Sequence, residues 1–410
     1  MPELFTVVTP DEALNRLRSH ISHRVDREDI KANLAAGRII ADDIHAPGDL
    51  PTFPRSTMDG YAVIARDTYG ATEAIPAYLN VIGEIPMGDL AGLALSSGEV
   101  ALVHTGGMLA DGADAVVMVE NTQPLDGTTI EVVRPVAPGE NVLQIGDDVK
   151  IGQLLLHAGH LLRPQDIGGL MGLGINRIAV SRRPRVSILS TGDELVSPDQ
   201  GLTAGKIRDI NTYSLSAITL QVGAIALTMS IVEDSFEALR DVAVKAIEQS
   251  DMLVISAGSS VSTRDMTAQV IASLGDPGVL VHGVSIRPGK PTILASVEGK
   301  PVIGLPGNPV SALVIFDLFA VPAMYWLAGC ERPPLRPTIT ARLTHNIASV
   351  TGREDYVSVR LETTDEGVLA EPIFGESNLI STMIKADGMA WIPLDKSGLS
   401  AGEIVLVRLF

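Results

Sequence analysis

The stretch covering residues 301–316 constrains the fold more than any other part of this sequence. Its first apolar run, residues 302–305, is typical of a strand that is buried on both faces. The sequence Pro306-Gly307-Asn308-Pro309 then predicts a stiff turn, after which apolar residues recur at helical spacing. A strand that enters a helix in this way indicates an α/β sheet, and the N–H groups at such a helix start can bind phosphates and other oxyanions. From this stretch alone, an ordinary turn without a ligand is the simpler interpretation.

Length, charge and cysteine content narrow the class of protein. A chain of 410 residues is too long for one hydrophobic core and predicts about two to four domains. A net charge of −18 without a local basic patch argues against nucleic acid, so an anionic substrate would need its own cations or a divalent metal. The single cysteine, Cys330, excludes an internal disulfide and a zinc site built from cysteines. Because the first residues carry no signal-peptide pattern and the apolar run 312–328 contains Asp317 and Pro322, we expect a buried helix, no membrane partner and a cytoplasmic protein.

An α/β pattern begins after Pro184. Strands are predicted at 185–189, 225–232 and 252–256, and helices at 212–220 and 236–249. This alternation indicates a mostly parallel sheet, in a domain that covers residues 184–330. Ligands of such sheets bind at the carboxyl ends of the strands, and each unusual loop of this region lies on that side. We therefore expect the binding site at that edge of the sheet.

Three further regions complete a multidomain architecture of α/β plus β type. They are a split helical domain at 1–46 and 142–183, a β-rich insert at 47–141, and a small C-terminal β-barrel or sandwich at 331–410. Within the split domain, Thr9 is a predicted N-cap, and further helices are predicted at 30–36 and 164–173. A proline-rich linker, Pro333-Pro334-x-x-Pro337, precedes the barrel.

The loops after the predicted strands carry groups that suit phosphate and metal chemistry. These groups are the carboxylates of Asp193, Glu194, Asp234 and Asp265, the hydroxyls of Ser259 and Ser260, and the cations of Arg264, Arg287 and Lys290. Carboxylates beside phosphate-binding loops suit Mg²⁺, while lysine and arginine would neutralise a nucleotide or a pyrophosphate leaving group. No Walker A, Gly-x-Ser-x-Gly or His-Glu-x-x-His sequence is present. Any one of these carboxylates is as readily interpreted as a solvated loop residue or a helix N-cap.

A set of motifs, taken in chain order, resembles one known family. The motifs are Pro54-x-Ser56-x-Met58-Asp59-Gly60-Tyr61-Ala62, Thr105-Gly106, Gly112-Ala113-Asp114-Ala115-Val116-Val117, Ser190-Thr191-Gly192-Asp193-Glu194-Leu195, Pro288-Gly289-Lys290-Pro291 and Gly304-Leu305-Pro306-Gly307-Asn308-Pro309-Val310-Ser311. Over nearly its whole length, the sequence resembles the molybdopterin molybdotransferases (MoeA; the gephyrin E domain in animals). This resemblance implies insertion of molybdate into adenylyl-molybdopterin with Mg²⁺ as cofactor, release of AMP and formation of molybdenum cofactor. It also implies the four domains described above and a homodimer.

The resemblance further implies which residues form the site. The implied catalytic residues are Asp59 and Thr105 on the insert, and Glu194, Asp234 and Asp265 on the α/β domain, of which Asp234 and Asp265 would hold Mg²⁺. The substrate-binding residues would be Asp148, Ser259, Ser260, Arg287, Lys290, Pro306, Gly307 and Pro309. Because molybdate exchanges oxygen ligands for the dithiolene sulfurs of the pterin, no protein nucleophile is required. Orientation and charge neutralisation would carry the catalysis.

The sequence departs from the family pattern at several of these positions. The loop that usually reads Ser-Gly-Gly-Val-Ser-Val-Gly is Ser256-Ala257-Gly258-Ser259-Ser260-Val261-Ser262. Arg287 and Gly283 replace two lysines, and Leu143 replaces an arginine. These changes bear on how oxyanion and phosphate are held, and they leave the choice between molybdate and tungstate open.

Two other functions stay open at this stage. One is a gephyrin-like scaffold, although nothing in the sequence resembles the additional domains and linker of such a protein. The other is adenylyl transfer onto molybdopterin, which predicts ATP consumption and a smaller chain without the insert. For the transferase, the resemblance implies that the insert of one subunit covers the sheet of the other, so that Asp59 completes the partner's site.

Overall fold

The computed structural model describes residues 7–258 and 261–410. The chain forms two compact units. The first comprises Met1–Asp42, Ala158–Pro164 and Arg177–Phe410, and the second comprises Asp43–His157 and Gln165–Asn176. The α/β sheet and the C-terminal barrel belong to the first unit, and the β-rich insert belongs to the second. The four domain boundaries given above stay a prediction, because this division yields two units.

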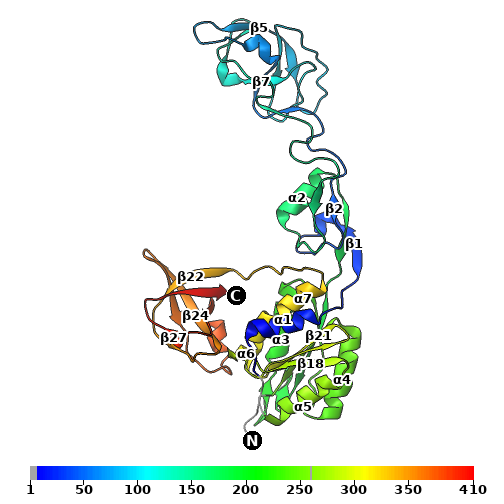
Figure 1. Cartoon of the computed structure of the whole chain (residues 1–410), viewed down its shortest axis with the longest axis vertical. Helices are drawn as coiled ribbons and strands as arrows, with labels where there is room; N and C mark the ends of the chain where they lie inside the picture. The colour runs from blue at the N-terminus through cyan, green and yellow to red at the C-terminus, as the bar shows by residue number, and fades with distance from the viewer. Residues whose placement is uncertain (1–6, 259–260) are drawn as a thin grey trace. The chain divides into compact units, whose positions relative to one another are not determined.

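A six-stranded sheet forms the centre of the first unit (Figure 1). In spatial order its strands are β16 (Ile225–Thr228), β13 (Arg185–Thr191), β17 (Met252–Ala257), β21 (Lys300–Pro306), β20 (Ile293–Val297) and β18 (Pro277–His282). The first three pairs of neighbours are parallel, and the pairs β21–β20 and β20–β18 are antiparallel. The mostly parallel sheet is therefore confirmed, and the carboxyl ends of β13, β17 and β21 lie next to one another at one edge.

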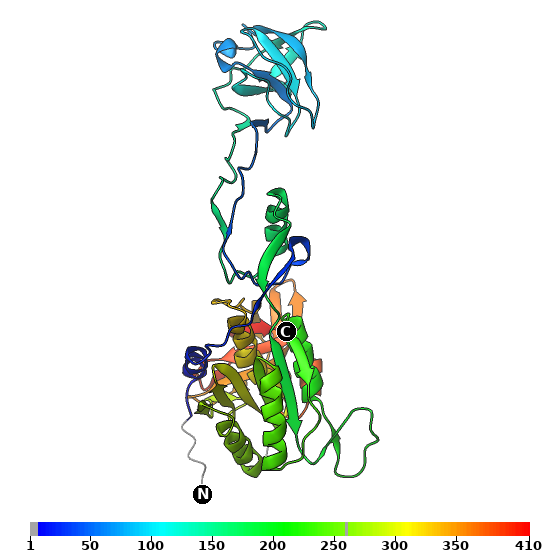
Figure 2. The ribbon, with the colours of Figure 1, turned by 90° about the vertical axis from the view of Figure 1, so that its right-hand side faces the viewer.

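Helices cover both faces of this sheet (Figure 1), and Figure 2 shows the same layers from a second direction. One face packs against α4 (Phe236–Gln249) and α5 (Val261–Ala272), and the other against α1 (Pro10–Ser19), α3 (Asn211–Gln221), α6 (Pro309–Ile315) and α7 (Val321–Leu327). Side chains of β17 alternate between the two cores, with Met252 and Val254 in one and Leu253 and Ile255 in the other. Burial on both faces explains why such strands are continuously apolar in sequence.

The stretch Pro309–Leu327 is long and apolar enough to cross a membrane by length and composition, but 72% of its apolar window is buried inside the structure. A π-helical turn at Phe316–Ala320 separates α6 from α7. Phe316 and Phe319 of this turn are fully buried in the core beside the sheet. The buried helix predicted for this region is confirmed.

The helical prediction for the split domain is partly wrong. Helix α1 starts as expected, with the Thr9 hydroxyl accepting a hydrogen bond from the Glu12 N–H at 3.2 Å, and α2 (Pro164–Gly172) also matches. The helix predicted at 30–36 is instead strand β1 (Arg27–Lys31) followed by a 3₁₀ turn at Ala32–Leu34. Strand β1 pairs antiparallel with β12 (Arg177–Ser181), so a distant partner overrides the local helical pattern.

The C-terminal region is a closed barrel, which confirms the first of the two predicted architectures. Its strands are β22 (Thr338–Leu343), β24 (Glu354–Thr364), β25 (Gly367–Pro372), β26 (Gly388–Ile392) and β28 (Ile404–Leu409). The order β24-β25-β22-β28-β26 closes because β26 also pairs with β24. A short strand, β19 (Ile286–Arg287), follows β18 in the chain and pairs parallel with the start of β24. This pairing joins the barrel to the loop that follows β18.

In the second unit, the insert forms the predicted β-rich domain, a six-stranded sheet. In spatial order its strands are β7 (Ala115–Met118), β4 (Gly60–Val63), β6 (Glu99–Val103), β5 (Ala77–Ile85), β9 (Thr129–Val132) and β8 (Thr122–Pro124). At the start of β4, a Cβ atom on Gly60 would lie 2.0 Å from the carbonyl oxygen of Val117. Only glycine therefore allows β4 and β7 to approach at this point, directly after Asp59.

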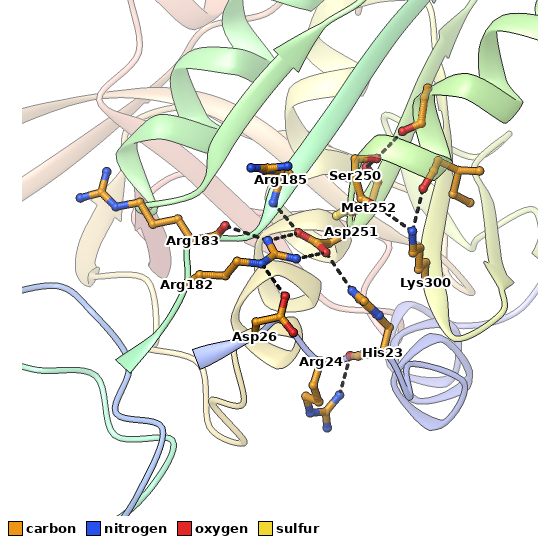
Figure 3. Close-up of polar contacts among 12 residues, drawn as sticks. His23, Arg24, Asp26, Arg182, Arg183, Arg185, Ser250, Asp251, Met252 and Lys300 are labelled. Carbon is orange, nitrogen blue, oxygen red and sulfur yellow. Dashed lines mark hydrogen bonds and ion pairs between the residues drawn. The ribbon is translucent and has the colours of Figure 1, made fainter. Parts of the chain in front are cut away.

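At the opposite edge of the α/β sheet, where β13 and β17 begin, a buried carboxylate organises a charged cluster (Figure 3). Asp251 accepts two hydrogen bonds of 2.7 Å from Arg182, one of 2.8 Å from His23 and one of 2.8 Å from the Arg185 N–H. Burial alone would raise the pKa of Asp251, but these hydrogen bonds outweigh burial and lower it to about 2. The cluster fixes His23, which precedes β1, and Arg182, which follows β12, to the N-terminal ends of β13 and β17.

Candidate functional site

The sheet topology brings the predicted site loops of the α/β region to one edge. Loops leave this edge after β13, β17 and β21, and the loop between β18 and β20 lies at the same edge because β18 runs parallel to β21. Two separate cavities open among these loops. The sequence predicted one site there, and the structure divides its residues between two.

The first cavity, called the acidic cavity here, has a volume of about 640 Å³. Its lining includes Asp193, Lys206, Asp209, Thr212 and Glu233. Beside it, the Thr191 hydroxyl donates a hydrogen bond of 2.7 Å to Asp234 Oδ1, and the Asp234 N–H donates one of 3.2 Å to Asp193 Oδ1. These bonds hold two carboxylates together at the end of β13, next to the segment that follows β16.

Two of the predicted catalytic carboxylates take no part in these hydrogen bonds. Glu194 is half-buried, with its carboxylate against Gly192, where an added Cβ would lie 3.0 Å from Glu194 Oε2. Asp265 is exposed on α5 and lines neither cavity. Asp193 holds Asp234 more directly than either of them.

The donor atoms around Asp234 fit the chemistry of Mg²⁺. Within residues 7–258 and 261–410, no three His, Cys, Asp or Glu residues form a group that could hold a metal ion. Mg²⁺ needs fewer protein ligands, because it keeps several waters and binds substrate phosphates in addition to one or two carboxylates. The oxygens of Asp193, Asp234 and Thr191 are hard donors of that kind, so this part of the edge suits an ion shared with a phosphorylated substrate.

The second cavity has a volume of about 1,020 Å³ and is called the interdomain cavity here, because both the α/β region and the barrel line it. The lining includes Arg287, Lys290, Pro306, Asn308 and Ser311 from the α/β region, and Arg353, Asp355, Glu376 and Ser377 from the barrel. Arg353 donates hydrogen bonds of 2.8 and 3.2 Å to the buried carboxylate of Asp355. The Arg287 guanidinium lies 3.9 Å from the same carboxylate, with 64% of its side chain exposed, so it is available to a ligand.

The predicted turn after β21 forms one wall of the interdomain cavity. Asn308 Nδ2 donates a hydrogen bond of 2.8 Å to the Ser377 hydroxyl, and the Val310 N–H donates one of 3.1 Å to the Ser377 carbonyl oxygen. A Cβ on Gly307 would lie 2.6 Å from the carbonyl oxygen of Ala257, so the turn packs directly on the end of β17. Pro309 is buried at the first turn of α6. The barrel thus already uses one backbone N–H that was predicted to face an anion.

The sequence analysis missed the barrel side of this cavity. Arg353, Asp355 and Ser377 lie outside the quoted motifs, and only the pairing of β19 with β24 brings them beside Arg287. One signal was present: Arg353, Glu354 and Asp355 are three charged residues at the start of a strand, and the last two are buried. Charged residues are almost never buried without a partner or a function.

On the insert, the structure brings Asp59 and Thr105 together. Asp59 Oδ1 accepts hydrogen bonds from the Thr105 N–H at 2.8 Å and from the Thr105 hydroxyl at 3.1 Å. The backbone and side-chain bonds from Thr105 lower the pKa of Asp59 below its usual value. His104 Nδ1 lies 3.9 Å from the same oxygen, and His104 Nε2 lies 2.9 Å from Glu84 Oε1. Asp59 is therefore a fixed, exposed anion.

Of the remaining predicted residues, the structure describes Asp148. Asp148 is exposed in a turn of the second unit, and its N–H donates a hydrogen bond of 3.0 Å to the Leu50 carbonyl oxygen. Ser259 and Ser260 lie outside the described residues.

Comparison with known proteins agrees with this fold. Residues 8–174 match the MoeA N-terminal region (domain I and II), residues 187–326 a "probable molybdopterin binding domain", and residues 340–410 the MoeA C-terminal region (domain IV). A solved structure of a molybdopterin biosynthesis MoeA protein from Pyrococcus horikoshii is 39% identical, with a TM-score of 0.78 over 98% of this chain and 99% of that one. The molybdopterin molybdenumtransferase of Nostoc is 35% identical over 93% of this chain and 88% of the relative. The molybdopterin molybdenumtransferase of Haemophilus influenzae is 30% identical over 98% of this chain and 99% of the relative.

These matches define a multidomain protein that contains a domain of the molybdopterin-binding type between two MoeA regions. The chain belongs to the MoeA family of molybdopterin biosynthesis proteins, as the motifs indicated.

Proposed function

We propose that this protein is a molybdopterin molybdotransferase, which inserts molybdate into adenylyl-molybdopterin and releases AMP. The interdomain cavity is the observation that carries the proposal. Its volume of about 1,020 Å³ lies at the upper end of the range for small-molecule sites, and Arg287, Lys290 and Arg353 line it. Relatives that carry the name molybdopterin molybdenumtransferase match this chain along nearly their whole length. An anionic substrate needs such cations in a protein with a net charge of −18.

The interdomain cavity and the carboxylates around Asp234 would have separate roles in this reaction. Arg287, Lys290 and Arg353 would bind and orient anionic oxygens in the interdomain cavity. Asp234, with Asp193 beside it and Asp265 as the second expected ligand, would hold Mg²⁺, which would neutralise the phosphates of the substrate when bound. Asp59 would act as a fixed anion that excludes wrongly placed oxyanions. Positioning and charge neutralisation would then carry the reaction.

The direct test of the function is analysis of the products. Purified protein is incubated with adenylyl-molybdopterin, Mg²⁺ and either molybdate or tungstate. AMP release together with a pterin that has gained the metal in mass analysis supports the proposal and identifies the preferred oxyanion. ATP consumption with pyrophosphate release from unmodified molybdopterin would indicate an adenylyltransferase instead. If the folded protein carries out neither reaction, the result favours the scaffold function.

Arg287 is expected to bind substrate rather than to support the fold. Its side chain is largely exposed and its ion pair with Asp355 is long, so exposed-pair energetics predict a stability change of at most about 1 kcal/mol on replacement. We expect Arg287→Ala to raise KM for adenylyl-molybdopterin about tenfold or more, and Arg287→Lys to be tolerated because it keeps the positive charge. Steady-state assays of AMP release measure both, with Arg360→Ala on the outer barrel as control. An unchanged KM in Arg287→Ala removes this residue from the site.

Asp234 is expected to contribute to Mg²⁺ dependence. Asp234→Asn keeps the shape of the side chain and an acceptor for the Thr191 hydroxyl, but it lacks the negative charge that attracts the ion. We expect the Mg²⁺ concentration for half-maximal AMP release to rise about tenfold or more, with unfolding unchanged. An Mg²⁺ titration identical to that of the wild type, in both Asp234→Asn and Asp265→Asn, would contradict the metal assignment.

We also propose a cytoplasmic homodimer in which Asp59 completes the site of the partner subunit. The test mixes inactive Asp59→Ala and Asp265→Ala subunits after dissociation. With random pairing, roughly half of the dimers are mixed and each has one intact site, so about a quarter of wild-type activity should return. If mixed dimers form and the mixture remains inactive, each site is built within one chain.

A further inference from the structure

The first turn of α3 connects the ends of three neighbouring strands. Thr212 Oγ1 lies 2.9 Å from Ser190 Oγ on β13. The side-chain amide of Asn211 donates two hydrogen bonds, one of 2.7 Å to Ser256 Oγ on β17 and one of 2.9 Å to the carbonyl oxygen of Gly307 after β21. Asn211 is only 7% exposed, so these bonds form away from water. No motif of the sequence analysis included Asn211.

Through these bonds, Asn211 connects the walls of the two cavities. Its chain neighbours Asp209 and Thr212 line the acidic cavity. Its acceptor, Gly307, lies between Pro306 and Asn308, which line the interdomain cavity. A displacement of this amide would therefore move the turn relative to both cavities.

The orientation of the amide is fixed by the chemistry of its partners. A carbonyl oxygen only accepts hydrogen bonds, so the NH₂ group of Asn211 must face Gly307. Both of its hydrogens are then used, and Oδ1 is buried without a hydrogen-bond partner in the part of the chain that the structure describes. A buried acceptor without a partner is unfavourable. Stability alone therefore does not account for an asparagine at this position.

We propose that Asn211 is a positioning residue for the transferase reaction. It holds the Pro306–Asn308 turn at a fixed place on the end of β17. A substrate molecule that contacts both the turn and the acidic cavity is then always bound in the same geometry. This inference rests on the proposed function, because it assigns Asn211 an effect on that reaction. The residue need not touch the substrate, and it acts through Gly307.

Two variants test the proposal. Asn211→Leu keeps the approximate side-chain size and removes both hydrogen bonds and the unpaired oxygen, and Asn211→Ser is too short to bridge both partners. The matched control is Thr219→Val on the same helix, which removes a buried hydrogen bond of 2.8 Å to the Leu215 carbonyl oxygen, away from the sheet edge. For each protein we measure kcat and KM for AMP release, the thermal unfolding midpoint, and amide hydrogen exchange in a peptide that covers residues 303–312.

We expect both Asn211 variants to lose about 10²-fold in kcat with little change in KM, because a displaced wall misaligns bound substrate. Exchange at 303–312 should become faster in both variants and stay unchanged in Thr219→Val, which should keep wild-type kcat. The proposal is overturned if either folded Asn211 variant keeps wild-type kcat. It is also overturned if kcat falls only as far as the folded fraction falls, with the same loss in Thr219→Val.

The design separates this inference from the proposed function. If wild-type protein releases no AMP from adenylyl-molybdopterin, the proposed function fails, irrespective of Asn211. Hydrogen exchange needs no substrate, so it still shows whether Asn211 holds the turn. Unchanged exchange in both variants contradicts the positioning role even when the wild type is active.

Discussion

Replacing Asp251 by alanine is expected to destabilise the first unit by about 2–3 kcal/mol, the order of free energy that corresponds to lowering its pKa from 3.8 to about 2 on folding. Asp251 is 3% exposed and accepts hydrogen bonds from Arg182, His23 and the Arg185 N–H. Without the carboxylate, the Arg185 N–H loses its acceptor at the start of β13, and Arg182 loses the acceptor of two hydrogen bonds. Urea unfolding followed by tryptophan fluorescence measures the effect, because both tryptophans, Trp326 and Trp391, belong to the first unit.

The pH dependence of this stabilisation follows from the pKa of Asp251. Its folded-state pKa of about 2 lies below the ordinary value of 3.8, so folding favours the charged form. The contribution is therefore fully present above about pH 4 and is lost as the pH falls from 4 towards 2. Wild-type protein should lose this contribution over that range, whereas Asp251→Asn should lack it at every pH.

A matched control for Asp251 is Asp241→Asn, at an exposed position of α4, which should leave unfolding unchanged within about 0.5 kcal/mol. If Asp251→Ala unfolds at the same urea concentration as the wild type, the charged cluster of Figure 3 does not stabilise the unit.

Replacing Gly307 by alanine is expected to lower kcat by about 10²-fold, because small displacements of positioning groups are sufficient for such losses. The added Cβ would lie 2.6 Å from the carbonyl oxygen of Ala257, closer than real Cβ contacts allow. Strand β17 lies between β13 and β21 and pairs with both, so the turn must move instead. That movement displaces Pro306 and Asn308 from the wall of the interdomain cavity.

Gly168→Ala is the control for this prediction, because an added Cβ on this exposed residue of α2 meets nothing within 4 Å. Steady-state AMP release measures the effect, and circular dichroism shows whether each variant is folded. A folded Gly307→Ala protein with wild-type kcat would mean that the turn tolerates displacement and does not position the substrate.

Local signals allowed several elements to be predicted closely. Helix α4 was predicted at 236–249 and forms at Phe236–Gln249, with the Ser235 hydroxyl accepting a hydrogen bond from the Ala238 N–H at its start. The turn at Pro306–Pro309 was predicted from its prolines and glycine alone, since these residues restrict the backbone whatever surrounds them. The family was recognised because its motifs are short, contiguous stretches.

Pairing between distant residues decided what the local patterns did not. Strand β1 replaced a predicted helix because Ile30 pairs with Ile178 on β12. Asp59 meets Thr105 because Gly60 pairs with Val103 across β4 and β6. In both cases, the partner lies far away in the chain, and only the folded sheet determines it.

By itself, the sequence determined the α/β alternation, the β-rich insert and the MoeA family, because each depends on residues that are close together in the chain, and it predicted the site residues. Only the tertiary structure decided how those residues are grouped. The pairing of β19 with β24 placed barrel residues such as Arg353 beside Arg287. The cations line one cavity, and Asp193, next to Asp234, lines another. The tertiary structure also placed the amide of Asn211 between the strand ends, where its two hydrogen bonds join Ser256 to the turn at Gly307. The physical reason is that cavities and buried hydrogen bonds form between elements, so no single stretch of sequence contains them.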